Sequence, residues 1–427
     1  MLNPASRWMV EHHASVLPIW RREVAPPWRI VHFDSHWDLG LTLPQLPRDA
    51  ETQADVVGYV VDGTYHDGNF LHRVWSPEVI ESFTWVMSPK EPASAAQLLP
   101  RIRAELQTFS GVGLEDVYSL VLDGRTVRGT VRGVPVTVCG IAELKTVRDP
   151  NILDIDLDAV VGADFDPSQL APNEVLLRDS LTQIAKIEQQ FHAAVKVETI
   201  AVSESGGYLP GSVARLLRQT LNVPMAMVAD EPPVYSDTLN ESAAWIRSGN
   251  FRSAAARLSS ERLEHLPGYW LACAMVETGL GNREAAMAAY EKVLNAPKSP
   301  AHALHLAYHN MGYICSLKED AEMALRYYQH AYELKQDPGS LYGMGSALWS
   351  MGEPEAALAA FRQVLLSHPA HPYARYSLAA ILSDRHRWEA VAEILDPRVQ
   401  YPPTILGSVR YLRNRAQEAD GVGGSGR

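Results

Sequence analysis

The stretch Val31-His-Phe-Asp-Ser-His-Trp-Asp-Leu39 decides the fold of the first half of this chain. The apolar-rich run Trp28–Phe33 that overlaps it predicts a short buried strand. Alternate side chains of a strand point to one side, so Asp34, His36 and Asp38 are expected to converge at its carboxyl end. Two carboxylates and an imidazole suit a divalent cation such as Mn²⁺. The alternative is a polar turn in which His36 is satisfied locally.

A second acidic strand is predicted downstream, at Asn151-Ile-Leu-Asp-Ile-Asp-Leu-Asp158. It places Asp154, Asp156 and Asp158 on one side. Three carboxylates this close repel one another, and a bound dication removes the repulsion. The alternative is a solvated edge strand with an acidic rim, which the apolar alternate positions disfavour.

Two histidines follow a third predicted strand, Arg7–Glu11, and precede the helix-like run Ala14–Trp20. A turn from strand to helix lies at the carboxyl edge of an open α/β sheet, where such folds build their sites. His12 or His13 is therefore a candidate ligand. The alternative is that both histidines lie on the surface.

The combination Glu11-His-His with Val16-Leu-Pro, then His32-Phe-Asp-Ser-His-Trp-Asp-Leu, then Leu153-Asp-Ile-Asp-Leu-Asp, resembles the ureohydrolase (arginase and agmatinase) family. It is most similar to a divergent branch, the peptide arginases, over about residues 1–225. The resemblance implies an arginase-like α/β fold, a mostly parallel sheet with helices on both faces. It also implies two Mn²⁺ ions, held by His13, Asp34, His36, Asp38, Asp154 and Asp156.

Within this resemblance, His13 is preferred to His12 because it keeps the branch's spacing to Leu17-Pro18. The chain departs from ordinary arginases in lacking Gly-Gly-Asp-His before the first ligand and in continuing its Asp-x-Asp strand to Asp158. Asp164-Phe-Asp166 is a rival Asp-x-Asp, but it follows a Gly-containing turn rather than an apolar strand.

The resemblance implies further roles for side chains near the metals. Glu204 corresponds to a glutamate that binds the substrate guanidinium and takes part in catalysis. Gly68-Asn-Phe-Leu-His72 resembles, with one extra residue, a loop whose histidine shuttles protons, which makes His72 catalytic and Asn69 substrate-binding. Asp38 would pass a proton to the leaving amine. The alternatives are a surface acid at Glu204 and a packed or exposed histidine at 72.

The rest of the first 225 residues predicts alternating strands and helices, which favours a largely parallel sheet covered on both faces. The predicted strands are Phe83–Met87, Asp116–Leu122 and Glu198–Ser203, the helices are Ala93–Phe109 and Val175–Val195, and a β-hairpin spans Arg125–Cys139.

A Pro-rich linker over 226–238 leads into an Ala-, Leu- and Tyr-rich helical region at 239–416. There an Ala followed four residues later by a large apolar residue recurs about every 33 residues, close to the tetratricopeptide length of about 34. The five pairs are Ala254 with Leu258, Ala286 with Tyr290, Ala324 with Tyr328, Ala357 with Phe361, and Ala390 with Ile394. Such solenoids present concave surfaces to peptides or partner subunits. The alternative is an inert helical appendage, and residues 417–427 are expected to be a disordered tail.

Composition narrows the functional classes. The net charge of −12 and the lack of a basic stripe argue against nucleic acid as a partner. The three cysteines are scattered, no secretory signal is evident, and no apolar run is long enough to span a membrane, so a cytoplasmic location is expected.

The resemblance implies a binuclear manganese hydrolase that converts arginine side chains to ornithine with release of urea, and the motif spacing agrees with it. An arginine-containing, ribosomally made peptide, held by the helical repeats, is the predicted substrate. Two alternatives are a zinc-dependent, deacetylase-like amidohydrolase on the related fold, and an inactive repeat-based adaptor. The sequence leaves open which peptide is modified and whether the protein is a homo-oligomer.

Overall fold

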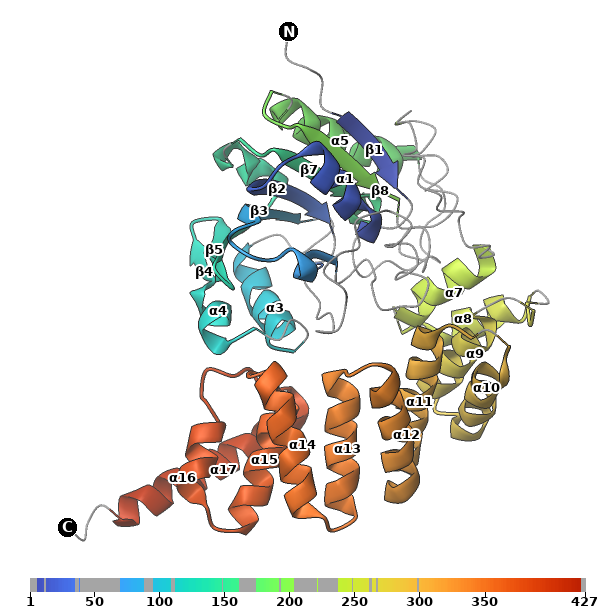
Figure 1. The fold of residues 1–427 in the computed structure, drawn as a ribbon, viewed down its shortest axis with the longest axis vertical. Coiled ribbons are helices and arrows are strands. Elements are labelled where there is room, and N and C mark those ends of the chain that lie inside the picture. Colours follow the sequence, from blue (N-terminus) through green and yellow to red (C-terminus); the bar gives the residue numbers. More distant parts are fainter. Residues whose placement is uncertain are drawn as a thin grey trace. The chain divides into compact units, whose positions relative to one another are not determined.

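The computed structural model describes residues 6–10, 13–34, 38, 70–87, 95–108, 112–147, 149–160, 174–191, 193–202, 221, 237–247, 249–260, 263–265, 268–297 and 299–423 (Figure 1). The chain forms two compact units. One unit contains Met1–Leu99 and Ser119–Ala303, and the other contains Pro100–Tyr118 and Leu304–Arg427. These units differ from the division at 225 and 239 that the sequence predicts.

Eight strands of the described residues form one sheet in the order β1-β8-β7-β2-β3-β6-β5-β4. The six strands from β1 to β6 in this order are parallel, and β5 and β4 add an antiparallel edge. Their bounds are β1 Ser6–Val10, β2 Trp28–Asp34, β3 Ile80–Met87, β4 Val121–Asp123, β5 Thr126–Val131, β6 Val134–Cys139, β7 Ile152–Asp156 and β8 Val197–Ala201. From β2 the chain continues to β3 on one side, whereas β7 and β8 lie on the other. The order therefore reverses between β2 and β7, the type of position where open α/β sheets bind ligands.

The two faces of the sheet differ in chemistry. Val31, Phe33, Leu153 and Ile155 are buried in an apolar cluster that includes side chains of α5 (Glu174–Phe191). The alternate residues toward the carboxyl ends of β2 and β7 are His32, Asp34, Asp154 and Asp156, which point to the opposite face because side chains alternate along a strand. That face is covered by the 3-10 helix η1 (His13–Ser15), helix α1 (Val16–Glu23) and the 3-10 helix η2 (Phe70–Arg73). Helix α1 contacts β8 and η1, and η1 contacts η2.

Several predicted elements are confirmed, and three are corrected. The predicted hairpin is formed by β5 and β6, joined at Arg132 and Gly133, both with positive φ (47° and 81°). The predicted strand 151–158 ends at Asp156, and Asp158 lies in the 3-10 helix η4 (Leu157–Val160). The predicted helix 93–109 is α3 (Ala95–Thr108), which contains Pro100.

The second correction concerns residues 116–122, which the sequence predicts as a strand. Most of them form the end of helix α4 (Leu114–Ser119), followed by the three-residue β4. Leu114 and Val117 lie three residues apart and are both buried, which is helical spacing. Glu115 and Asp116 occupy the first turn, where the helix dipole favours acidic side chains.

A helical solenoid follows the sheet region in sequence, as predicted. Its helices come in pairs: α7 Asp237–Arg247 with α8 Phe251–Leu258, α9 Tyr269–Gly279 with α10 Arg283–Asn295, α11 Ala301–Leu317 with α12 Ala321–Leu334, α13 Pro338–Ser350 with α14 Pro354–Ser367, and α15 Pro372–Asp384 with α16 Trp388–Ile394. In the first four pairs the predicted Ala and its large partner are buried. In the fifth pair Ala390 is only partly buried, and its neighbour Val391 is the fully buried residue.

The turn before the second helix of each pair has one residue in the left-handed region. The five residues are Gly249, Gly281, Glu319, Gly352 and His386, with φ of 74°, 81°, 60°, 79° and 55°. This repeated conformation marks the same position in all five pairs, including the two in which the residue is not glycine.

The third correction concerns the C-terminal tail. Helix α17 runs from Pro403 to Gly423, past the predicted start of disorder at Gln417. Val409, Leu412 and Ala416 bury one side of it in a cluster that also contains Leu114. Nearby, the backbone N–H of Gln400 donates to Oε1 of Gln107 at 3.0 Å. Residues 100–118 thus pack with the C-terminal helices. Among the described residues we find no helix with the length and apolarity needed to cross a membrane.

Candidate metal centre

A cluster of buried polar side chains lies where the strand order reverses. Asp34 ends β2, Asp154 and Asp156 lie on β7, and His13 begins the 3-10 helix that follows β1. Asp38 lies four residues beyond β2. No side chain in this set of five is more than 5% exposed. Five of the six predicted metal ligands therefore meet at one place.

The remaining predicted site residues cannot be placed with these five. His36, Asn69 and Glu204 lie outside the described residues, as do His12, Asp164 and Asp166. The backbone at His72 lies in η2, but its side chain is outside the described part. Of the two candidate histidines, His13 lies among the carboxylates, and His12 is outside the described residues.

The structure adds a residue to the cluster that the sequence analysis missed. His32 lies on β2 two residues before Asp34, is fully buried, and pairs in register with Asp154. Its signal in the sequence was the same two-residue alternation that identified Asp34, extended one step backward.

The nitrogen and oxygen atoms of the cluster are spaced like ligands of a shared cation. His13 Nδ1 lies 3.0 Å from Asp38 Oδ2 and 3.0 Å from Asp156 Oδ2. His32 Nε2 lies 3.2 Å from Asp34 Oδ2. With metal–ligand bonds of about 2.1 Å, adjacent ligands around an octahedral ion are about 3 Å apart. Three atoms of this group, His13 Nδ1, His32 Nε2 and Asp38 Oδ2, are buried without a hydrogen-bond partner among the described residues. The residues therefore fit a divalent cation.

The candidate ligands form two overlapping triads. One is His13, Asp34 and Asp156, and the other is His32, Asp34 and Asp38. Each triad offers one imidazole and two carboxylates, a donor set that suits Mn²⁺ and related ions. Asp34 belongs to both triads, so the two groups share a carboxylate.

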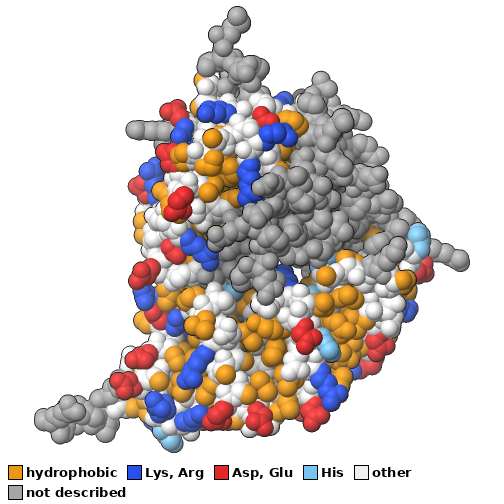
Figure 2. Space-filling model, in the orientation of Figure 1, with side chains coloured by type: hydrophobic (Ala, Val, Ile, Leu, Met, Phe, Trp, Pro, Cys, Tyr) orange, Lys and Arg blue, Asp and Glu red, His pale blue; other side chains and the backbone are white. Residues whose placement is uncertain are grey.

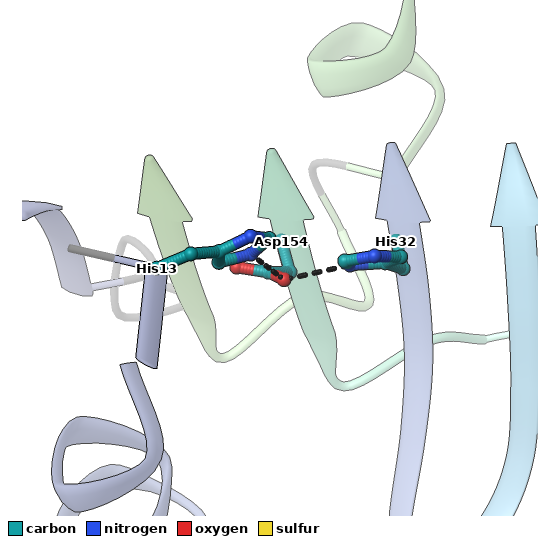
Figure 3. A group of neighbouring side chains, drawn as sticks. All are labelled: His13, His32 and Asp154. Carbon is teal, nitrogen blue, oxygen red and sulfur yellow. Dashed lines mark hydrogen bonds and ion pairs between the residues drawn. The ribbon is translucent and has the colours of Figure 1, made fainter. Parts of the chain in front are cut away.

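A third triad is closed by hydrogen bonds rather than open to a ligand (Figure 3). Asp154 Oδ2 lies 2.7 Å from His13 Nε2 and 2.8 Å from His32 Nδ1. The other oxygen, Oδ1, accepts a hydrogen bond from Thr199 Oγ1 at 2.6 Å, and Thr199 Oγ1 accepts one from Trp20 Nε1 at 3.0 Å. Figure 3 shows the two rings on either side of the Asp154 carboxylate.

The crowding of charge shifts the pKa values of the group in opposite directions. Burial alone would lower the pKa of His32, but hydrogen bonds and charges from Asp154 and Asp34 outweigh it and raise the pKa to about 10. Burial and the charge of Asp34 raise the pKa of Asp38 to about 8. Burial would raise the pKa of Asp154, yet His13 and His32 lower it to about 2. The cluster thus favours positive charge at its centre, as a proton or as a cation.

Aromatic side chains border the cluster, and one residue of the cluster has a strained backbone. The Phe70 ring of η2 lies 4.7 Å from the ring of His13, so η2 borders the site. Trp85 Nε1 donates to the backbone carbonyl of Asp34 at 2.9 Å. Asp38 has a φ of 54°, a left-handed conformation that L-residues adopt at a cost, and such strain concentrates at functional sites.

The neighbouring Asp158 supports the cluster through its backbone. Its N–H donates to Asp156 Oδ1 at 3.0 Å, which leaves Oδ2 of that carboxylate directed toward His13. Asp158 thus orients the Asp156 carboxylate through its main-chain N–H.

Comparisons with known proteins identify the repeats. The family model for the tetratricopeptide repeat matches residues 305–338 and 338–371, so the C-terminal helices include tetratricopeptide repeats. No curated protein matches the chain.

Three solved structures are similar to it in part. The crystal structure of MamA is 15% identical, with 45% of this chain and 99% of that chain covered and a TM-score of 0.31. The complex of the TPR2AB domain of yeast Sti1 with pHSP90 is 14% identical, with 42% and 84% covered and a TM-score of 0.25. The APC/C hetero-tetramer Cut9–Hcn1 is 14% identical, with 56% and 52% covered and a TM-score of 0.31.

Proposed function

We propose that this protein is a metal-dependent hydrolase that converts arginine side chains within a peptide to ornithine, releasing urea. The observation that carries the proposal is the buried group of His13, His32, Asp34, Asp38 and Asp156 at the point where the strand order reverses. Buried carboxylates in this number are costly unless a cation compensates them. The choice of a guanidinium substrate rests on the motif resemblance described above.

The proposed reaction adds water across one carbon–nitrogen bond. A guanidinium group and water give a primary ammonium group on the peptide and free urea, so charge and atoms balance. A divalent cation bound here would make a water molecule nucleophilic at neutral pH. Asp38 would take the proton of that water and deliver it to the departing nitrogen. Phe70 would limit access of bulk water beside His13, which strengthens the electrostatic interactions in the site.

The tetratricopeptide repeats support a peptide as the substrate, because such repeats present extended protein-binding surfaces. Hydrophobic side chains gather over the repeat helices in Figure 2. Large exposed apolar residues in these helices are Tyr313, Leu317, Leu334 and Leu366, and Met351 follows directly after α13. Peptide binding at the repeats would keep an arginine near the site at high effective concentration.

The test is incubation of the metal-loaded protein with arginine-containing peptides. Mass spectrometry of the peptide and a colorimetric assay for urea should report ornithine and urea in equal amounts with Mn²⁺. Asp34→Ala should lose both products while remaining folded, as checked by circular dichroism. Metal-loaded protein that releases neither product from any arginine peptide would overturn the proposed reaction. Release of acetate from acetyl-lysine peptides by the Zn²⁺ form would favour the deacetylase-like alternative.

A repeat-based adaptor is the second candidate function, and the match of residues 305–371 to the tetratricopeptide repeat favours it. In that case the α/β region would bind a cation without turnover. The test is binding of peptide libraries to the full chain with and without EDTA. Equal affinity under both conditions, with no product formed, would support the adaptor over the hydrolase.

A further inference from the structure

A row of side chains crosses three neighbouring strands behind the candidate metal centre. His32 on β2 is in register with Asp154 on β7, and Asp154 is in register with Thr199 on β8. Register in a parallel sheet places these three side chains next to one another on the same face. All three are completely buried. Helix α1 adds Trp20 and the 3-10 helix before it adds His13.

The direction of each hydrogen bond in this row is fixed by chemistry. An indole N–H can only donate, so Trp20 Nε1 donates to Thr199 Oγ1. The single hydroxyl proton of Thr199 is then directed to Asp154 Oδ1, 2.6 Å away. The other oxygen of Asp154 faces nitrogens of both histidines, at 2.7 and 2.8 Å. Both oxygens of Asp154 are therefore engaged by donors from the protein.

This arrangement determines which ring nitrogens can bind a cation. An ionised carboxylate only accepts, so Nε2 of His13 and Nδ1 of His32 carry the hydrogens. In each neutral ring the opposite nitrogen then offers a lone pair, which makes His13 Nδ1 and His32 Nε2 the donor atoms. Both atoms face the carboxylates of the two open triads. A lone pair facing carboxylate oxygens at about 3 Å is repulsive unless a proton or a cation lies between them.

We propose that Asp154 is a positioning residue that holds both histidines, and that His32 is a cation ligand. This inference rests on the proposed metal centre and changes its assignment, because the motif resemblance makes Asp154 a ligand and gives His32 no role. One buried carboxylate would orient a histidine for each of two cations. Acceptors of this kind fix the tautomer of metal-binding histidines and increase their basicity.

The test measures Co²⁺ binding to the full-length chain by calorimetry and by the visible spectrum of the bound ion. The variants are Asp154→Ala, Asp154→Asn, Thr199→Val and His32→Ala. Asp154→Ala should weaken binding by ~10–100-fold, the usual cost of removing such an acceptor. Asp154→Asn should recover most of the affinity, because its amide oxygen still accepts from both rings, and it should keep the wild-type band positions. Thr199→Val should weaken binding less and also keep the bands, whereas His32→Ala should shift them by removing a nitrogen ligand.

The opposite pattern would overturn the inference. If Asp154→Asn binds as weakly as Asp154→Ala and shifts the bands, while His32→Ala leaves them in place, Asp154 is a ligand and His32 is not. If the substitutions at 154 fail to fold, His32→Ala keeps the test decisive, because shifted bands report a nitrogen ligand at position 32 and unchanged bands overturn the inference. Wild-type protein that binds no Co²⁺ or Mn²⁺ would overturn both the metal centre and this inference. Binding without urea release would overturn only the proposed reaction.

Discussion

The interior beside β2 and β7 and the interior of the repeats are both fully buried, but they are stabilised by different means. The first collects carboxylates and imidazoles from distant parts of the chain. The second closes aromatic rings over glycine and alanine. A Cβ atom at Gly343 would come within 2.5 Å of the Tyr328 ring, and one at Gly345 within 2.7 Å of the Phe361 ring. Burial alone therefore does not define a core. The repeat rings pack against small residues of the same chain, whereas the buried carboxylates beside β2 and β7 would be stabilised by a positive charge from solution.

The largest expected difference between the two interiors is their response to a cation. Mn²⁺ at a thousandfold excess over its Kd should stabilise the sheet region by about 4 kcal/mol, through preferential binding to the folded state. Asp34→Asn should abolish this gain, yet without metal it should be at least as stable as wild type because it removes one crowded charge. Hydrogen exchange of peptides from β2 and β7, with and without Mn²⁺, measures the effect. Peptides from α13 and α14 serve as the internal control, and equal protection in both regions would contradict the comparison.

The repeat interior should instead be sensitive to one added methyl group. Gly343→Ala should destabilise the protein by about 1–3 kcal/mol, because the Tyr328 ring has no room to move without disturbing its neighbours. Gly407→Ala is the matched control in helix α17, where an added Cβ meets nothing within 4 Å. It should stabilise the helix by about 0.5–1 kcal/mol. Urea unfolding followed by circular dichroism distinguishes the two, and similar midpoints for both variants would argue against ring-over-glycine packing.

A buried carboxylate with a partner from the protein offers a test within the sheet region. Glu198 pairs with Arg7 at 2.8 Å, but burial and the nearby Glu188 raise its pKa from 4.5 to about 7. The folded state therefore binds this proton more tightly than the unfolded state, so stability falls as pH rises from about 4.5 to about 7.

Glu198→Gln should reduce that fall by about 1–2 kcal/mol, because the amide does not titrate. Thermal unfolding at pH 5 and pH 7 gives the comparison with wild type. Glu81→Gln removes a half-exposed carboxylate that pairs with Arg29, and it controls for the loss of one acidic side chain. A Glu198→Gln profile as steep as that of wild type would show that other groups control stability in this range.

The smallest expected effect lies in the turns between paired helices. Glu319 has a φ of 60° where three of the other pairs have glycine. Glu319→Gly should stabilise the repeats by up to about 1 kcal/mol, because glycine adopts this conformation without a steric cost. Gly352→Ala is the reverse change at the equivalent position, which has open space around it and a φ of 79°. It should lower the urea midpoint, and a lower midpoint for Glu319→Gly as well would mean that the glutamate side chain stabilises its turn.

Sequence patterns predicted individual strands and helices better than they predicted which strands and helices lie next to one another. Two-residue alternation predicted β2 and β7 and the side on which Asp34, Asp154 and Asp156 lie. It could not predict that β7 stands between β2 and β8, since strand order depends on contacts far apart in the sequence. The roles of His32 and Thr199 depend on that order. The same limit applies to α4, where burial of Leu114 against the C-terminal helices favours a helix over a strand.

The packing of residues 100–118 with the C-terminal helices has a consequence during synthesis. Gln107 and its partner Gln400 are 293 positions apart. At a ribosomal rate of about 5–20 residues per second, the segment emerges roughly 15–60 s before its partners exist. Through that interval Leu114 has nothing to bury it, although strands on either side of the segment can already pair. The nascent chain therefore exposes Leu114 between strands that can already pair, which makes this segment a suitable target for a chaperone until translation is complete.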